Sequence, residues 1–262
     1  VGDWHLPVEQ VGTMEELEKS DGGTLAAVVI EPLIQGAAGM HLWPLGMLRE
    51  VREWCDRRGV LLILDEVMTG FGRTGKMFAC EWEGVVPDMV GLAKGLTGGY
   101  LPMAATMTSE RIFSAFLGGA ERTLYYGHSY TANALGCAAA LASLAIFREE
   151  NVLGKLGGKI EVLRGLLGEL AEIPEVWEVR QCGMIVGIEL READGQRFPG
   201  EALMGAKVCV AARRHGLLTR PIRDVVVLVP PYCMTESELG QAVRAIGLAV
   251  REVCVGKVVG ES

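Results

Sequence analysis

Apolar runs and helical periodicities alternate along the first half of the chain. Four short apolar runs are typical of buried strands, and they cover residues 25–30, 60–64, 89–93 and 103–107. Residues 44–58 carry apolar side chains every three positions, begin with a proline and precede Gly59, which predicts a helix. Strands that alternate with helices predict an α/β fold with a mainly parallel sheet, covered by helices on both faces.

The pattern changes near residue 150. Long helices are expected over residues 133–147 and 152–171, on either side of this point. Short elements follow, with strands expected at 176–180, 184–190 and 225–229 and helices near 203–215 and 235–253. We therefore expect two domains, a large one in residues 1–150 and a smaller α+β C-terminal domain in residues 151–262.

Composition narrows the possible function classes. The 262 residues are 50% hydrophobic, which is enough for a sizeable core, and the net charge of -8 argues against a nucleic-acid surface. The seven cysteines form no C-x-x-C pair, so we expect reduced thiols in a cytoplasmic protein. The four histidines lack metal-ligand spacing, and no apolar run reaches the roughly 18 residues of a membrane helix. We expect neither a metal site nor a membrane span.

Two residues of complementary chemistry follow predicted strands. Asp65 and Lys94 each come directly after an apolar run, 29 positions apart. Ligands bind at the carboxyl ends of strands in open α/β sheets, so both side chains are candidates for one crevice. A lysine amine condenses with an aldehyde, and a carboxylate holds a proton on a cofactor's ring nitrogen. Spacing alone leaves open a turn-capping Asp65 and a surface Lys94.

A competing motif lies between these two residues. Residues 70–76 read GFGRTGK, which matches the G-x-x-x-x-G-K pattern of a phosphate-binding loop. Met77 then stands where a magnesium-binding serine or threonine belongs, and no clear helical period follows. The pattern therefore favours a different role for these glycines, although a nucleotide-binding function stays open.

Two segments together resemble the class III aminotransferases, which are pyridoxal-phosphate-dependent enzymes of fold type I. The first, residues 64–75, reads LDEVMTGFGRTG, and the second, residues 87–99, reads PDMVGLAKGLTGG. The resemblance covers essentially the whole chain. It implies pyridoxal 5'-phosphate as cofactor, Lys94 as the Schiff-base lysine and Asp65 as the partner of the ring nitrogen. Glu31 would lie near the cofactor ring, with a structural role equally open.

The same resemblance implies roles in the second half of the chain. His128 and Ser129 would contact the cofactor phosphate, and Ser129 also suits the N-cap of the helix that follows. Gly127 would contact the substrate, and Arg220 would bind the substrate carboxylate, with Arg223 as a close competitor. In the family the segment around Ser129 reaches the neighbouring subunit's site, which implies a homodimer.

Further stretches indicate one branch of this family. Four of them, FACE at 78–81, LTGGYLPMAAT at 96–106, YGHSYTAN at 126–133 and PPY at 230–232, resemble enzymes that aminate 8-amino-7-oxononanoate in biotin biosynthesis. Met68 and Ala37 stand where many other relatives carry glutamine and glutamate. The missing glutamate argues against a glutamate-type amino donor. The resemblance to this branch implies S-adenosylmethionine as the donor, with lysine as an alternative.

The chain also lacks segments that the resemblance leads one to expect. It begins with Val1, and it contains no counterpart of the phosphate loop and ring-stacking aromatic residue that relatives carry earlier. We therefore expect a protein that is inactive or barely active alone. Two alternatives remain open: another class III aminotransferase acting on an ω-amino acid or diamine, and an inactive fragment that acts only as a binding module.

Overall fold

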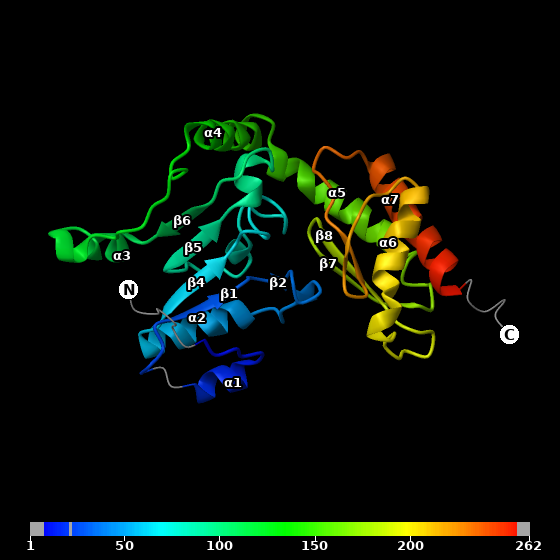
Figure 1. Ribbon diagram of the computed structural model, residues 1–262, viewed down its shortest axis with the longest axis horizontal. Helices are drawn as coiled ribbons and strands as arrows, with labels where there is room; N and C mark the ends of the chain where they lie inside the picture. Colours follow the sequence, from blue (N-terminus) through cyan, green and yellow to red (C-terminus); the bar gives the residue numbers. More distant parts are fainter. Residues whose placement is uncertain (1–7, 21–22, 256–262) are drawn as a thin grey trace.

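A computed structural model describes residues 8–20 and 23–255 of the chain (Figure 1). Its first sheet has the strand order β1-β4-β5-β6, with β1, β4 and β5 parallel and β6 antiparallel to β5. The strands are β1 (Ala27–Ile30), β4 (Leu61–Asp65), β5 (Met89–Leu92) and β6 (Ala105–Thr108). The predicted α/β fold with a mainly parallel sheet is confirmed.

One face of this sheet packs against α2 (Met47–Arg58). Trp54 of α2 and Leu62 and Leu64 of β4 are fully buried there, and the short helix α1 (Met14–Lys19) adds Leu17. Helix α2 ends at Gly59, whose φ of 68° is the left-handed conformation that glycine adopts readily. The predicted helix is therefore correct, except that it begins at Met47 rather than Pro44.

The opposite face of the first sheet is open at β1. Val29 and Ile63 are register partners that point away from α2, and Val29 is 66% exposed. The expectation that helices cover both faces is therefore wrong for the part of the sheet that the structure describes. Alternation along β4 places the side chain of Asp65 on this open face.

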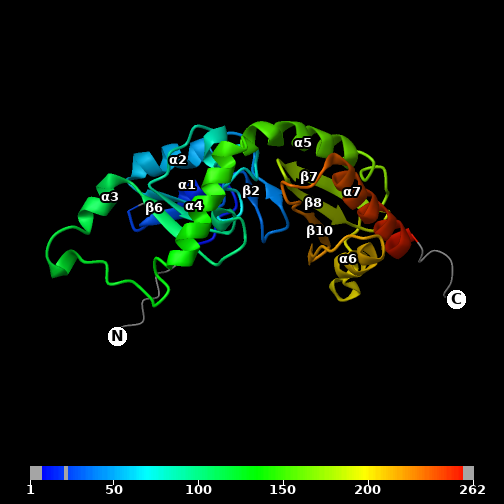
Figure 2. The same ribbon diagram turned by 90° about the horizontal axis from the view of Figure 1, so that it is seen from above.

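A second sheet, entirely antiparallel, has the order β7-β8-β10-β9. Its strands are β7 (Val176–Cys182), β8 (Ile185–Leu190), β10 (Val225–Leu228) and β9 (Pro221–Ile222). Helices α5 (Val152–Leu167), α6 (Met204–Arg214) and α7 (Glu236–Val250) bury one face, with Val186 and Ile188 of β8 in the shared core. Figure 2 shows the two sheets side by side, with α5 lying along the second one.

A hairpin from the first half of the chain covers the other face of the second sheet. It consists of β2 (Ile34–Gln35) and β3 (His41–Leu42), and Ile34 packs in one cluster with Ile185 and Val227. At its tip, Arg180 of β7 donates a 2.8 Å hydrogen bond to the carbonyl of Gly39. This hairpin joins the two sheets into one structure.

A long exposed strap lies between the first sheet and α4 (Ala134–Glu149), within the first half of the chain. It leaves α3 (Glu110–Ala115), continues through residues 116–133 and returns to α4, well outside the sheet (Figures 1 and 2). A sharp turn at Asn151, with φ of 49°, then leads into α5. We propose that the domain boundary predicted near residue 150 lies at this turn.

Short helical turns complete the fold. They are η1 (Ala79–Trp82), η2 (Lys94–Thr97), η3 (Ala120–Arg122), η4 (Gly200–Ala202) and the π-helical turn η5 (Arg251–Val255). Among the described residues, no helix is long and apolar enough to cross a membrane.

Candidate active site

Two carboxylates lie at neighbouring carboxyl ends of the first sheet. Ile30 and Leu64 are register partners in the parallel strands β1 and β4, so the residues that follow them, Glu31 and Asp65, leave the same edge. One carboxylate oxygen of Asp65 accepts a 3.0 Å hydrogen bond from the amide of Val67. Both side chains line a cavity of about 230 Å³.

The two carboxylates differ in how firmly they are held. The Oε2 atom of Glu31 accepts from the amide of Gly36 at 2.9 Å, and its carbonyl accepts from the indole of Trp43 at 3.0 Å. Glu31 thus stabilises the start of the β2–β3 hairpin, and this bonding supports the structural role left open for it. Asp65 keeps one carboxylate oxygen free of hydrogen bonds to the described residues.

Lys94 leaves the same edge of the sheet from the next strand. Gly91 of β5 is the register partner of Asp65, and Lys94 follows it by three residues. The backbone of Lys94 has φ of 42°, which is rare for a residue with a side chain and marks a strained turn. Its side chain is exposed, and its amine makes no hydrogen bond or ion pair with any described residue. The amine is therefore available to react.

The glycine-rich segment between Asp65 and Lys94 does not form a phosphate cradle. The amides of Gly70, Gly72 and Gly75 already donate to carbonyls within the segment. Lys76 donates to the carbonyl of Glu81 at 3.0 Å and lies 4.6 Å from the centroid of the Trp82 ring. Because these three glycine amides and the Lys76 amine already have acceptors in the protein, the geometry argues against a nucleotide-binding role for the segment.

Glu66, the residue after Asp65, bonds to residues on both sides of the glycine-rich segment. It is fully buried and accepts from the Thr69 hydroxyl at 2.6 Å and from the amides of Ala79 and Cys80 at 2.9 Å. Burial and this nearby carboxylate raise the pKa of the Cys80 thiol to about 12. Sequence reasoning missed Glu66; its place after a buried strand was the only available signal.

The predicted phosphate and substrate contacts lie on the exposed strap. Residues 113–135 are all exposed, and the Ser129 side chain makes no hydrogen bond to a described residue. The His128 amide donates to the Thr131 hydroxyl at 2.9 Å. Asn133 caps α4 by accepting from the amide of Gly136 at 3.0 Å, so the alternative of Ser129 as the N-cap is wrong.

Arg220 lies at the start of the edge strand β9 of the second sheet. Its carbonyl accepts from the amide of Val227 at 3.3 Å, while its guanidinium is exposed and unpaired among the described residues. Arg223 is exposed as well, with φ of 52°. No described contact joins Arg220, Gly127, His128 or Ser129 to the edge that carries Asp65 and Lys94.

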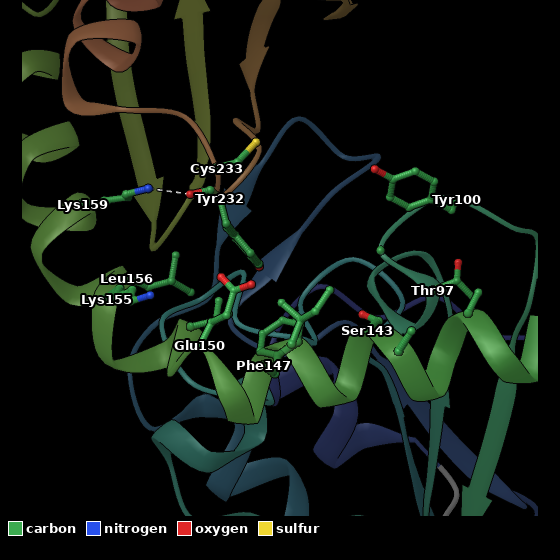
Figure 3. A pocket seen from close by; sticks show the side chains of 15 residues that line it. Thr97, Tyr100, Ser143, Phe147, Glu150, Lys155, Leu156, Lys159, Tyr232 and Cys233 are labelled. Atoms are coloured by element: carbon green, nitrogen blue, oxygen red, sulfur yellow. Dashed lines mark hydrogen bonds between the residues drawn. The ribbon is translucent and has the colours of Figure 1, made fainter.

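A larger cavity, about 700 Å³, lies between α4, α5, the lysine segment and the loop after β10 (Figure 3). Thr97 and Tyr100 line it from the lysine segment, Phe147 from α4, and Tyr232 from the loop after β10. Lys159 of α5 donates to the carbonyl of Tyr232 at 2.6 Å, as Figure 3 shows. Neither Asp65 nor Lys94 lines this cavity, and no sequence motif indicated it.

The residues at the strand ends suit the cofactor that the sequence resemblance implies. An unpaired, exposed amine and a partly free carboxylate leave one edge of the sheet, from β5 and β4. These are the groups needed to bond an aldehyde and to hold a proton on a ring nitrogen. In the described residues no cluster of three potential metal ligands occurs, and pyridoxal 5'-phosphate needs none.

Comparisons with known proteins agree with this geometry. The family model of class III aminotransferases matches residues 6–250. The adenosylmethionine-8-amino-7-oxononanoate aminotransferase of Nitratidesulfovibrio vulgaris is 51% identical over 92% of this chain and 45% of its own length. The chain spans about half the length of the curated relatives it matches.

Solved structures give the same result. The adenosylmethionine-8-amino-7-oxononanoate aminotransferase of Methanocaldococcus jannaschii superposes with a TM-score of 0.84 at 42% identity, over 87% of this chain and 54% of that one. A PLP-bound amine transaminase from an uncultivated Pseudomonas species gives 0.83 at 36% identity, over 92% and 55%. The chain belongs to the class III aminotransferase family, whose cofactor is pyridoxal 5'-phosphate.

Proposed function

We propose that this chain carries the cofactor-binding lysine and acid of an aminotransferase that converts 8-amino-7-oxononanoate to 7,8-diaminononanoate in biotin biosynthesis. The observation that carries the proposal is the shared edge of β4 and β5, from which Asp65 and an unpaired Lys94 both leave. The substrate assignment rests on the named relatives, which are 51% and 42% identical to this chain.

Lys94 and Asp65 divide the chemistry between them. The bound cofactor would supply an electron sink that stabilises negative charge on the carbon next to the amine. The Lys94 amine would bond to the cofactor and, once displaced by the amino donor, carry a proton between substrate and cofactor. Asp65 would hold the ring nitrogen protonated with its free carboxylate oxygen, while the Val67 amide bonds to the other oxygen and orients the group.

Arg220 and the strap would complete the substrate site. The unpaired guanidinium of Arg220 suits a carboxylate, because its planar fork donates two parallel hydrogen bonds. We propose that Gly127 contacts the substrate, and that His128 and Ser129 contact the cofactor phosphate of a second copy of the chain. The exposed aromatic residues beside them, Tyr125 and Tyr126 (each 80% exposed), support a homodimer that covers this strap.

S-adenosylmethionine is the proposed amino donor, since the relatives' names include it. A second candidate function is that of another class III aminotransferase, acting on an ω-amino acid or diamine. The structural similarity to an amine transaminase, with a TM-score of 0.83, supports this second candidate. The two functions differ in their small-molecule substrates and share the roles of Lys94 and Asp65.

The decisive assay measures amino transfer by a chimera, because the chain spans about half the length of its relatives. The part of the N. vulgaris relative that lies before the matched region is fused in front of this chain. The chimera receives pyridoxal phosphate, 8-amino-7-oxononanoate and, in separate reactions, S-adenosylmethionine, lysine or an ω-amino acid. We expect 7,8-diaminononanoate, detected by mass spectrometry, with S-adenosylmethionine as donor.

Two controls make the assay interpretable. The Lys94→Ala chimera should form no product, while Lys207→Ala, which removes an amine from α6, should leave turnover unchanged. A folded chimera that uses only ω-amino acids would support the second candidate. A folded chimera with no transfer at all, beside an active N. vulgaris enzyme, would favour a binding role for the chain.

A further inference from the structure

The glycine-rich segment 70–76 lies between the two sheets and is held from both sides. It follows Glu66, whose buried carboxylate ties its two ends together through Thr69 and Cys80. Residues 69–72 and Thr74 are buried although they form no strand or helix. A buried irregular segment needs partners for its backbone, and several of these come from the C-terminal half.

Four contacts with residues of the second half of the chain converge on Phe71 and Arg73. The Tyr232 hydroxyl donates to the carbonyl of Phe71 at 2.7 Å. The Arg73 guanidinium lies 4.4 Å from the centroid of the Tyr232 ring and donates to the carbonyl of Pro230 at 2.7 Å. The amide of Met184, in the turn between β7 and β8, donates to the carbonyl of Arg73 at 2.8 Å.

The other side of Phe71 touches the lysine segment. A Cβ atom placed on Gly95, the residue after Lys94, would lie 2.8 Å from the Cβ of Phe71, so only glycine allows this approach. The Phe71 ring also packs with Leu96 and Leu92 in one buried cluster. The residues on both sides of Lys94 therefore rest on Phe71.

Phe71 and Lys94 are both strained, and each occupies the left-handed region without being glycine. Their φ angles are 57° and 42°. Such strain persists only where the surroundings fix the conformation, and it is concentrated at functional sites. At Phe71, this conformation is the one in which the carbonyl meets Tyr232 while the side chain meets Gly95.

We propose that Phe71, held by Tyr232, is a positioning residue for Lys94. Tyr232 packs against the C-terminal core, its hydroxyl fixes the backbone of Phe71, and the Phe71 side chain sets the turn that aims the lysine. This inference rests on the proposed function only in taking Lys94 as the residue that bonds to the cofactor. Burial raises the pKa of Tyr232 to about 12, against a smaller opposite effect of Arg73, so its hydroxyl remains a donor at neutral pH.

The test removes one hydroxyl group. Tyr232→Phe keeps the ring under Arg73 and deletes the bond to Phe71, and Tyr100→Phe is the matched control because Tyr100 is 89% exposed. Amide hydrogen exchange is followed by mass spectrometry on the chain itself. Loss of one neutral hydrogen bond should speed exchange of the peptide over residues 94–99 by about 2- to 12-fold. Residues 185–190 of β8 should keep their rate, and Tyr100→Phe should match the wild type.

A second variant separates positioning from general stability. Phe71→Gly relieves the strain at φ of 57° and removes the side chain from Gly95, so any loosening of residues 94–99 reports the lost contact. We expect faster exchange there than in Tyr232→Phe. Both variants should also reduce the fraction of Lys94 that pyridoxal phosphate and borohydride label at a fixed, subsaturating cofactor concentration.

Two results would overturn the proposal. One is unchanged exchange at residues 94–99 in both variants, and the other is an equal rise in β8, which would mean global destabilisation. A wild-type chain without any label on Lys94 would instead contradict the proposed function, while the exchange data would still decide whether the Tyr232–Phe71 contact orders the lysine turn.

Discussion

The two sheets of this chain differ in how well they are covered. In the second sheet, β8 is buried on both faces: Val186 and Ile188 pack under helices, and Ile185 packs under the β2–β3 hairpin. In the first sheet, α2 covers one face of β1 and β4, and Val29 on the other face is 66% exposed. The charged groups with candidate chemistry, Asp65 and Lys94, belong to the less covered sheet.

The second sheet therefore supports the fold, and the first sheet carries the groups that are candidates for chemistry. The well-packed sheet gives a rigid frame, because a close-packed core resists small displacements. The open face and edge of the first sheet leave room for a ligand and for further polypeptide beside Asp65. Two contacts tie the C-terminal half to the first half of the chain: Arg180 of β7 bonds to the hairpin, and Tyr232, in the loop after β10, bonds to Phe71.

The largest effect is expected at Arg180, where the two regions meet. This arginine is 3% exposed, pairs with Glu178 and with Glu189 at 2.6 Å, and holds the hairpin carbonyl of Gly39. Arg180→Met should lower the free energy of unfolding by about 3–5 kcal/mol, because buried carboxylate and carbonyl groups lose their partner. Urea denaturation measures this change.

The matched control for Arg180 lies on α5. Arg164 forms an ion pair with Glu161 at the surface, and both side chains are more than half exposed. Arg164→Met should cost about 1 kcal/mol or less. Equal losses for the two variants would contradict the view that the Arg180 cluster joins the two regions.

A pair of valine substitutions, one in each sheet, should give stability losses of intermediate size that differ between the sheets. Val226 in β10 is fully buried, whereas Val29 in β1 is 66% exposed. Val226→Ala should cost about 2 kcal/mol through lost burial and the cavity left behind, and Val29→Ala less than about 0.5 kcal/mol. Thermal unfolding measures both. A cost at Val29 as large as that at Val226 would show that the first sheet is covered on both faces in solution.

The smallest expected effect is a loss of folding stability at low pH, and it should arise in both regions. Burial raises the pKa of Asp88, but hydrogen bonds from the Leu62 amide, Arg52 and Arg111 outweigh this and leave its pKa below the usual value of 3.8. Glu189 in the second sheet behaves in the same way, with Arg180 and Arg191 as its partners.

A lowered pKa in the folded state means that the ionised form stabilises the fold. That stability is fully present above about pH 4 and is lost as the pH falls through the lower folded value. Asp88→Asn should therefore make the free energy of unfolding fall less steeply below pH 4. Identical slopes for wild type and Asp88→Asn would contradict the ion-pair account.

Periodicity predicted most of the long elements because their side chains are sorted by burial. The runs at 60–64 and 184–190 became β4 and β8, and the three-residue apolar spacing in 44–58 became α2. The β2–β3 hairpin, α1 and α3 were missed, because each is too short for a period to emerge. The open face of the first sheet was missed as well, since an exposed Val29 looks like a buried one in sequence.

The residues of the candidate site could also be predicted only in part. The sequence predicted that Asp65 and Lys94 leave the same edge of the sheet, because each follows a predicted strand. The structure places both residues at that edge. The roles of Gly127, His128, Ser129 and Arg220 stay predictions, because a lone serine or arginine carries no periodic signal and the strap meets no partner among the described residues. The Tyr232–Phe71 contact spans 161 positions, and no local pattern could have indicated it.

Reductive trapping of Lys94 tests the central claim most directly. Pyridoxal phosphate is added to the chain and to the chimera, borohydride fixes any covalent bond to an amine, and the labelled peptides are mapped by mass spectrometry. The account predicts a label on Lys94, while Lys76 and Lys159, whose amines already donate to backbone carbonyls, stay unlabelled. A folded chimera with no label on Lys94, or with label spread evenly over its lysines, would contradict it.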